Sequence, residues 1–381
     1  MKKVYALCAL AAFALAACTP KQENVVLTAS GLNPENFNST YNGAPTALYT
    51  LANKAGMEVC VTNFGGRIVS VVVPDRENKR RDVVLGFDKV EDSFPENNQS
   101  DFGAAIGRYA NRINQGQITL DGVTYQLPKN NFGHCLHGGP SGWQYQVYEM
   151  VEADSTHVKL KRFSPDGDNN FPGNVTAFVT YTLTDDNKID IQYEATTDKT
   201  TVINMTNHSY FNLSGMPDTH KIVDDVLYVN ASNYTPVDAT YMTTGAIVPV
   251  EGTPFDYRTA HLISDNITKD DEQIRFGNGF DHNWVLDTKG DINQIAAYLY
   301  NPQNGISLKV YTDEPGIQIY SGNFLDGTVK GKKGIVYGQR SGICLETQHY
   351  PDTPNKPDWP SAVLRPGETY RSHCIFAFGL D

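Results

Sequence analysis

Familiar motifs for nucleotide, nucleophile and metal chemistry are absent from this 381-residue sequence. It contains no G-x-x-x-x-G-K-[ST] phosphate loop, no G-x-G-x-x-G segment opening a helix, no G-x-S-x-G turn and no H-E-x-x-H pair. These absences argue against the nucleotide-binding, serine hydrolase and zinc peptidase classes. His134 and His137 in HCLH would point to opposite faces of a strand. Because no other cluster has the spacing of metal ligands, we expect no metal site.

Positive charge is also scarce. The chain has 31 Lys and Arg against 43 Asp and Glu, which gives a formal net charge of -12. This balance argues against a nucleic acid as partner, because proteins that bind nucleic acids present basic patches to the phosphates.

Helical periodicity is nearly absent, and its best candidate, residues 291–300 (DINQIAAYLY), is long enough for only one or two turns. Aromatic residues make up 11% of the chain, and the 32 Gly and 20 Pro add turn formers, a mixture that favours strands. Residues 117–127 and 175–197 are predicted hairpins, the first turning at Asp121-Gly122. We predict one all-β domain over residues 41–381, a sandwich of large antiparallel sheets.

The N-terminus resembles an export signal. Two Lys precede an apolar run that is too short to span a membrane comfortably. The run ends in Leu15-Ala16-Ala17-Cys18, which resembles a bacterial lipoprotein cleavage box. We predict a signal peptide over residues 1–17 and a lipid on Cys18. The alternative is ordinary signal cleavage beside an incidental Cys.

Lipidation would make the protein an exported, membrane-anchored lipoprotein in the periplasm or outer membrane of a Gram-negative bacterium. It would then touch a membrane through its lipid only. Residues 18–40 are polar and turn-rich, and we expect most of them to form a tether. Disulfides are permitted outside the cytoplasm, but wide spacing favours buried free thiols for the remaining Cys. These are Cys60, Cys135, Cys344 and Cys374.

An unusual polar pattern follows residue 203. If the chain there is one strand, alternate side chains share a face. One face would carry Asn204, Thr206, His208, Tyr210 and Asn212. The opposite face would carry Ile203, Met205 and Phe211, which suit a core. Taken alone, this stretch fits a polar strand face that meets solvent.

Further polar residues stand inside apolar, strand-like text. They are Asn111 and Arg112 in GRYANRI, His137 in LHGG, Asp281 in GFDHNW, Gln318 in PGIQIYSGN and Glu346 in ICLETQHYPD. Glu346 would share a strand face with Cys344 and Gln348, and a carboxylate in such a strand needs partners because buried charge is costly. Each residue taken singly has a structural explanation, such as a local ion pair or a turn.

Taken together, these segments resemble the aldose 1-epimerases (galactose mutarotases) in content and order. The matching blocks are NFGGRIVSVVVPDR, DVVLGFD, IGRYANRI, LHGG, TNHSYFNL, TPFDYR, GFDHNW, EPGIQIYSGN and LETQHYPDTPN. The resemblance runs from about Tyr41 to the C-terminus. It departs in NNFGHCLHGG, where the family has a more polar, Asn-containing lead-in, so the local cleft wall is not predicted.

The resemblance implies an all-β supersandwich, galactose mutarotase-like, with an open sugar cleft on one sheet. It implies His208 as the catalytic acid and Glu346 as the base. The sugar-binding positions would be Asn111, Arg112, His137, Asp281 and Gln318. The substrate would be a free aldose of the galactose or glucose type. The reaction would interconvert its α and β anomers by ring opening and reclosure.

The residue types suit this chemistry. A base takes the C1 hydroxyl proton while an acid protonates the ring oxygen, and neither step requires a cofactor or metal. With ordinary pKa values of roughly 4.3 for Glu and 6.5 for His, the rate should rise as Glu346 ionises. An imidazolium donor at His208 would make it fall again at higher pH, whereas a neutral donor would give a plateau.

Three other functions fit parts of the sequence. A non-catalytic carbohydrate-binding module could use Arg112, Asp281 and a stacking Trp284, but would not need both His208 and Glu346. A glycoside hydrolase requires two carboxylates, for which Asp281 and Glu346 are candidates. An enzyme for phosphorylated hexoses would need a basic cluster, and these segments offer only Arg108 and Arg112.

Overall fold

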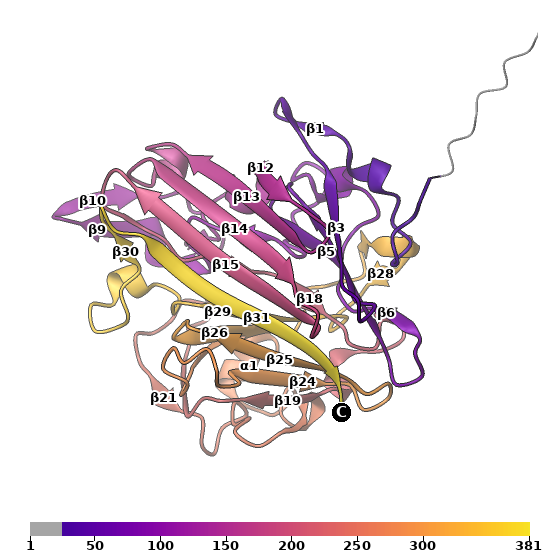
Figure 1. Cartoon of the computed structure of the whole chain (residues 1–381). Coiled ribbons are helices and arrows are strands. Elements are labelled where there is room, and N and C mark those ends of the chain that lie inside the picture. Colours follow the sequence, from indigo (N-terminus) through magenta and orange to yellow (C-terminus); the bar gives the residue numbers. More distant parts are fainter. Residues whose placement is uncertain (1–24) are drawn as a thin grey trace, which may run out of the picture.

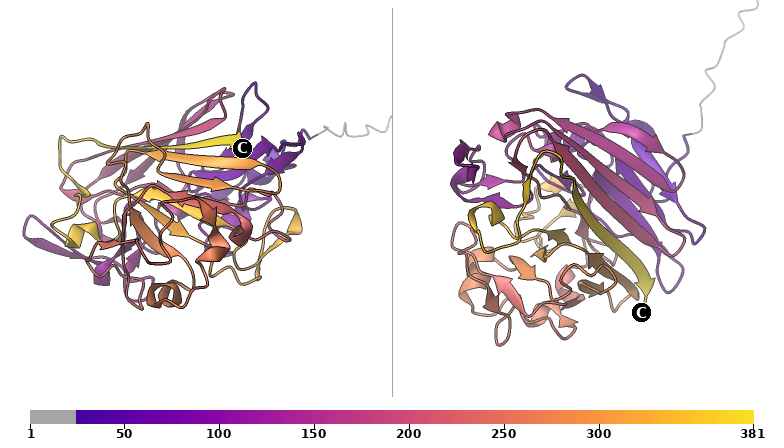
Figure 2. Two further views of the ribbon diagram at one scale, coloured as in Figure 1. Left: turned by 90° about the horizontal axis from the view of Figure 1, so that it is seen from below. Right: turned by 60° about the vertical axis from the view of Figure 1, so that its left-hand side comes forward.

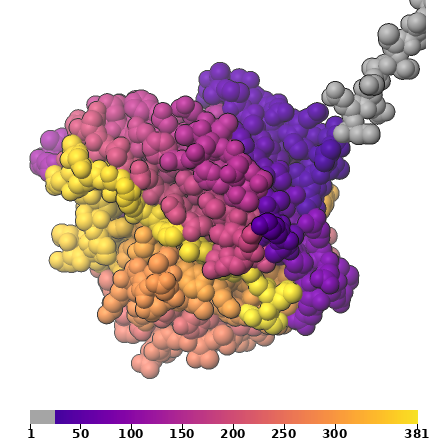
Figure 3. All heavy atoms as spheres, viewed as in Figure 1, coloured from indigo at the N-terminus to yellow at the C-terminus, as the bar shows by residue number. Residues whose placement is uncertain are grey.

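The computed structural model describes residues 25–381, so the predicted signal peptide and the lipidation site Cys18 lie outside the described residues. Two antiparallel sheets form the body, as Figures 1 and 2 show. The nine-stranded sheet has the order β12 (Glu149–Ala153), β13 (His157–Ser164), β14 (Val175–Leu183), β15 (Lys188–Thr197), β31 (Tyr370–Leu380), β25 (Ile306–Thr312), β24 (Ala297–Tyr300), β19 (Val226–Val229) and β22 (His261–Leu262). In Figure 3, β31 is the yellow band between the magenta strands and the orange ones.

The second sheet has six strands and carries the functional site. Its order is β18 (Tyr210–Phe211), β29 (Ile343–Gln348), β26 (Gly316–Tyr320), β23 (Asp281–Val285), β20 (Asn233–Thr235) and β21 (Val248–Pro249). A four-stranded sheet of β3 (Leu48–Ala52), β4 (Glu58–Thr62), β5 (Arg67–Pro74) and β6 (Arg80–Asp82) adjoins them. These sheets agree with the predicted all-β class.

Side-chain alternation explains the two layers. Along β14, every second residue is buried, and Val175, Ala177, Val179 and Tyr181 belong to the main core. The six-stranded sheet differs because all residues of β26 and β29 are buried. One of its faces supplies apolar residues such as Leu345 to the main core. Its other face is free to carry polar groups at a cavity.

The weak helical prediction for residues 291–300 is wrong. Ala297–Tyr300 forms β24, because Ala297 and Leu299 alternate into the core while their neighbours are half-buried. The α-helix of the described residues is α1 (Glu272–Gly277), which begins after Asp271, whose side chain accepts hydrogen bonds from two backbone amides. Within residues 25–381, no helix has the length and apolarity to cross a membrane.

The packed body starts earlier than the predicted tether allows. Leu32 and Phe37 are buried in one cluster with Phe64 and Phe94, so residues before 41 contribute to a hydrophobic core. A short 3-10 helix, Pro34–Phe37, lies in this segment. The polar composition of residues 18–40 concealed these two apolar anchors.

The thiol prediction is confirmed for the part of the chain that the structure describes. Cys60, Cys135, Cys344 and Cys374 are all buried and free.

Candidate active site

A cavity of about 400 Å³ opens on the six-stranded sheet, on the side opposite the main core. Six of the seven predicted catalytic and sugar-binding residues line it. They are Asn111, Arg112, His137, His208, Asp281 and Glu346. Segments far apart in the sequence therefore meet in one place, in a cavity of a size typical of small-ligand sites.

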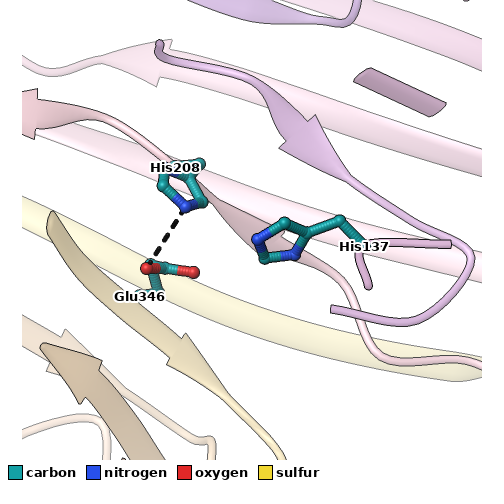
Figure 4. A group of neighbouring side chains, drawn as sticks. All are labelled: His137, His208 and Glu346. Atoms are coloured by element: carbon teal, nitrogen blue, oxygen red, sulfur yellow. Dashed lines mark ion pairs between the residues drawn. The ribbon is translucent and has the colours of Figure 1, made fainter. Parts of the chain in front are cut away.

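Glu346 and His208 face each other at the floor of the cavity. Glu346 extends from β29, and its Oε1 lies 3.5 Å from Nε2 of His208 (Figure 4). Both side chains are buried, with exposures of 1% for Glu346 and 6% for His208. The other carboxylate oxygen, Oε2, has no hydrogen-bond partner within residues 25–381. An acid–base pair with a free acceptor therefore faces the cavity.

His208 reaches this position because the predicted strand is broken. β17 (Thr206–Asn207) pairs with β7 (Ala105–Ile106), and β18 pairs with β29. At the switch between these partners, the His208 amide donates to the carbonyl of Ala104 at 2.9 Å. The imidazole is thus fixed at a chain crossing.

The five polar residues that were expected to share one strand face therefore have different environments. His208 and Tyr210 line the cavity, but Asn204 and Asn212 do not. The side-chain amide of Asn204 donates to two backbone carbonyls, and the side-chain amide of Asn212 does the same. Buried Asn residues here satisfy loop backbone rather than contacting a ligand.

Cys344 contacts the second ring nitrogen of His208, Nδ1. It precedes Glu346 by two residues on β29, so both side chains share a face. Its Sγ lies 3.6 Å from Nδ1 of His208. A thiol is a weak donor and a weak acceptor, so it can pair with Nδ1 whether or not that nitrogen carries a proton.

His137 is held by a reciprocal contact with Asn111. The Asn111 amide donates to Nδ1 of His137 at 3.1 Å, and the His137 amide donates to the Asn111 carbonyl at 3.1 Å. Both residues have positive φ, +50° for His137 and +63° for Asn111, a conformation that is uncommon for non-glycine residues. Because Nδ1 accepts, the ring proton is on Nε2, which serves as a donor.

Arg112 and Asp281 form a second charged pair in the cavity. The Arg112 Nη1 lies 4.0 Å from Asp281 Oδ2. Gln318 is the predicted binding residue that does not line the cavity. Its Nε2 donates to Asp281 Oδ1 at 2.8 Å, so it positions that carboxylate. Both charges thus have partners, as buried charges require.

Burial shifts the two facing groups toward their neutral forms. It holds the pKa of Glu346 well above its usual value, reinforced by the carboxylates of Asp281 and Asp101 and opposed by Arg112. Burial also lowers the pKa of His208 to about 4. The order expected from ordinary values, Glu below His, is therefore reversed. Both shifts favour the form in which His208 is neutral and Glu346 is protonated.

Sequence reasoning missed two kinds of residue here. Asp101 lines the cavity from a loop, and burial raises its pKa to about 6. Phe132, Tyr320 and Phe324 also line it. Phe132 stands in the segment where the family resemblance departs, so that cleft wall is aromatic. Tyr320 stands in the EPGIQIYSGN block but was not singled out, and Asp101, Phe132 and Phe324 lie outside the matching blocks.

The structure disfavours the alternatives that relied on Trp284 and Arg108. Trp284 is fully buried, and its Nε1 donates to the carbonyl of Phe255, so it offers no stacking surface. Arg108 does not line the cavity and donates to carbonyls that include those of Ser164 and Pro172. The cavity therefore has Arg112 as its one lining Arg or Lys within the described residues, fewer than a phosphate cluster needs.

The fold creates one cluster that sequence spacing concealed. His137, His208 and Glu346 have potential ligand atoms within 4.8 Å of one another. Figure 4 shows the His208 imidazole paired with the carboxylate and the His137 imidazole beside this pair. A metal, however, requires an unprotonated ring nitrogen. The backbone amide of Asn111 already donates a hydrogen bond to His137 Nδ1, which leaves the ring proton on Nε2 as a donor. This arrangement suits a hydroxyl ligand better than a cation.

A buried carboxylate facing an imidazole, surrounded by polar groups on a β-sandwich, defines an acid–base catalyst for a small polar ligand. The model of the family Aldose 1-epimerase matches residues 47–377. The chain belongs to this family of isomerases.

Known proteins of the family match over most of their length. A galactose mutarotase from Rattus norvegicus is 43% identical over 326 residues, covering 85% of this chain and 92% of the relative. An aldose 1-epimerase from Escherichia coli (strain K12) is 40% identical over 339 residues, covering 88% and 96%. The crystal structure of a galactose 1-epimerase from Lactobacillus acidophilus NCFM aligns with TM-score 0.78 at 31% identity, covering 90% of this chain and 97% of that one.

Proposed function

We propose that this enzyme interconverts the α and β anomers of free aldoses, with Glu346 as the base and His208 as the acid. The observation that carries the proposal is the 3.5 Å separation of Glu346 Oε1 and His208 Nε2 in a buried cavity. The names of the relatives support galactose as one substrate. Glucose has the same hemiacetal and fits the same chemistry.

Ring opening moves two protons and breaks one bond. The Glu346 carboxylate takes the proton of the C1 hydroxyl, the C1–O1 bond becomes a carbonyl, and the bond from C1 to the ring oxygen breaks. The ring oxygen receives the Nε2 proton of His208. Rotation of the carbonyl followed by the reverse steps gives the other anomer, so no proton is gained or lost overall.

His208 must act as an imidazolium in this scheme. A neutral ring that gave up its Nε2 proton would become a buried anion, which is strongly disfavoured. The active enzyme therefore holds Glu346 ionised and His208 protonated. It has the same proton count as the form that burial favours, with neutral His208 and protonated Glu346. This predicts a bell-shaped pH profile rather than a plateau.

The other cavity residues hold the sugar. His137 Nε2 and Arg112 donate hydrogen bonds, and the carboxylate of Asp281 accepts them. Gln318 contributes indirectly, because its hydrogen bond to Asp281 positions that carboxylate. A sugar bound among these groups places its C1 hydroxyl at Glu346 and its ring oxygen at His208, with the anomeric carbon above the pair.

Polarimetry on freshly dissolved α-glucose, β-glucose and α-galactose tests the proposal. The enzyme should accelerate the approach to the equilibrium rotation without forming new molecules. If no free aldose were accelerated, the proposal would fail and a binding module would explain the cavity better. The release of new reducing ends from glycosides would instead indicate a hydrolase.

We propose further that Cys18 is the lipidated first residue of the mature protein. The supporting text is the basic start, the apolar run and Leu15-Ala16-Ala17-Cys18. Expressed in a Gram-negative host, the wild type should fractionate with membranes, and Cys18→Ser should become soluble. A soluble, unmodified wild type would contradict the anchor.

A further inference from the structure

Asp101 is a carboxylate of the cavity that has no role in the acid–base scheme. It lies in the connection between Ser93 and Ala105, outside the segments that resemble the family. It lines the cavity, and its Oδ1 is buried without a hydrogen-bond partner within residues 25–381. A carboxylate oxygen that is removed from water needs a donor. A bound ligand can supply that donor.

The other two carboxylates that line the cavity have side-chain partners. Asp281 accepts a hydrogen bond from Gln318 at 2.8 Å, and Glu346 faces the imidazole of His208 at 3.5 Å. Asp101 differs because its pairing is incomplete. Burial raises the pKa of Asp101 to about 6, so the side chain is mainly ionised above neutral pH. It is then a charged acceptor at the edge of the cavity.

The backbone on both sides of Asp101 is fixed by one buried arginine. Nη1 of Arg67 donates to the carbonyl of Ser100 at 3.1 Å and to the carbonyl of Phe102 at 3.0 Å. These carbonyls directly precede and follow Asp101 in the chain. The Arg67 charge also lowers the pKa of Asp101 and thereby opposes the effect of burial. The carboxylate is therefore held in place in its ionised form.

Asp101 lies on the side of His208 that is remote from Glu346. The amide of Gly103, two residues after Asp101, donates to the carbonyl of His208 at 3.0 Å. The imidazole of His208 faces Glu346 on β29, and Asp281 lies on β23, two strands farther along the same sheet. Across the floor of the cavity, the order is therefore Asp101, His208, Glu346 and Asp281.

This order determines which part of a sugar meets Asp101. In the proposed function, the C1 hydroxyl lies at Glu346 and the ring oxygen lies at His208. The ring oxygen of a pyranose is bonded to C1 and to C5, and C5 carries C6. Beyond the ring oxygen, on the side away from Glu346, the sugar therefore continues with C5 and the C6 hydroxyl.

We propose that Asp101 accepts a hydrogen bond from the C6 hydroxyl, so that the enzyme favours aldohexoses over their 6-deoxy analogues and over pentoses. This inference rests on the proposed function, which places the ring oxygen at His208. The terminal torsion of an Asp side chain is broad, so either oxygen can turn toward the ligand. A sugar without this hydroxyl leaves the charged acceptor unpaired, and sites built on such hydrogen bonds reject analogues that lack the partner group.

The test compares galactose with 6-deoxygalactose, which differs only at C6. The measured quantity is the ratio of their kcat/KM values, by polarimetry at pH 8, where Asp101 is ionised. Asp101→Ala should lower this ratio about ten- to hundredfold, the factor for a hydrogen bond to a charged acceptor, while kcat/KM for 6-deoxygalactose changes little. Asp101→Asn keeps a neutral acceptor oxygen and should give an intermediate ratio. Glucose and xylose, which lacks C6, form a second pair.

Glu96→Ala is the matched control. Glu96 is an exposed carboxylate on the same connection and does not line the cavity, so its removal should leave the ratio unchanged. Circular dichroism checks the fold of each variant.

The outcomes separate this specificity from the basic activity. A wild type that shows no preference for galactose over 6-deoxygalactose overturns the proposal. A folded Asp101→Ala protein that loses the same factor on both sugars also overturns it, because the side chain would then serve the fold alone. A wild type inactive on every free monosaccharide overturns the proposed function instead.

Discussion

Replacing Gly138 by alanine should destabilise the protein and disturb His137, which directly precedes it. Gly138 has a φ of +78°, where an L side chain costs about 1–2 kcal/mol. An added Cβ would also overlap the Gly107 carbonyl oxygen and lie 2.8 Å from the Arg108 amide nitrogen. Backbone atoms cannot move aside cheaply, so overpacking adds roughly 1–3 kcal/mol. The expected total loss in the free energy of unfolding is about 2–5 kcal/mol.

Gly122→Ala is the matched control for this prediction. Its φ is +80°, nearly that of Gly138, but nothing lies within 4 Å of the added Cβ. It should cost only about 1–2 kcal/mol, from backbone strain alone. Urea unfolding measures both free energies. Polarimetry should give a raised KM for Gly138→Ala only. Equal stability of the two variants would refute the steric reasoning.

Three further predictions concern proton transfer and sugar binding. The pH profile of kcat/KM should be a bell. Its acid limb should lie near pH 4, where His208 binds the second proton of the pair, and its alkaline limb should follow the raised pKa of Glu346. Rates measured over pH 3–10 check this, and limbs at the ordinary pKa values of Glu and His would contradict it. Asp281→Asn should move the alkaline limb to lower pH because it removes a negative charge near Glu346, and should raise KM at least as much as it lowers kcat. Cys344→Ser should move the acid limb to higher pH, because a hydroxyl accepts a hydrogen bond from His208 Nδ1–H better than a thiol does. Cys344→Ala should move the acid limb to lower pH. The same acid limb in both variants would show that the side chain at position 344 does not stabilise the imidazolium.

The strands were predictable where local pattern dictates them. The hairpin over residues 175–197 became β14 and β15, because alternating apolar residues require one buried face. The hairpin at Asp121-Gly122 became β9 (Gln117–Leu120) and β10 (Val123–Gln126). Both turns have short, polar sequences that fix the register.

Other features depended on contacts between distant segments. The break in the strand at His208 follows from pairing first with β7 and then with β29, which no local pattern reveals. Leu32 and Phe37 are two apolar residues in polar text, and their burial requires partners such as Phe94. The order of titration at Glu346 and His208 depends on burial, which the sequence does not give.

Motifs identified most of the residues that line the cavity, whereas their contacts with one another came from the fold. Gln318 acts on Asp281 rather than lining the cavity, and Trp284 belongs to the core. Asp101, Phe132 and Phe324 were not predicted as lining residues, because a carboxylate or a Phe in a loop has no distinguishing pattern. A cavity gathers such residues only after the chain has folded.

The central claim is that Glu346 and His208 exchange protons with the sugar. Its most direct test is kcat for Glu346→Gln, measured by polarimetry on the best aldose with protein whose fold is verified by circular dichroism. The amide keeps the shape and hydrogen bonding of the side chain but cannot accept the C1 hydroxyl proton. We predict a loss of about 10²–10⁴-fold in kcat, and a similar loss for His208→Asn. A folded Glu346→Gln enzyme that kept near wild-type kcat would contradict the assignment of the base.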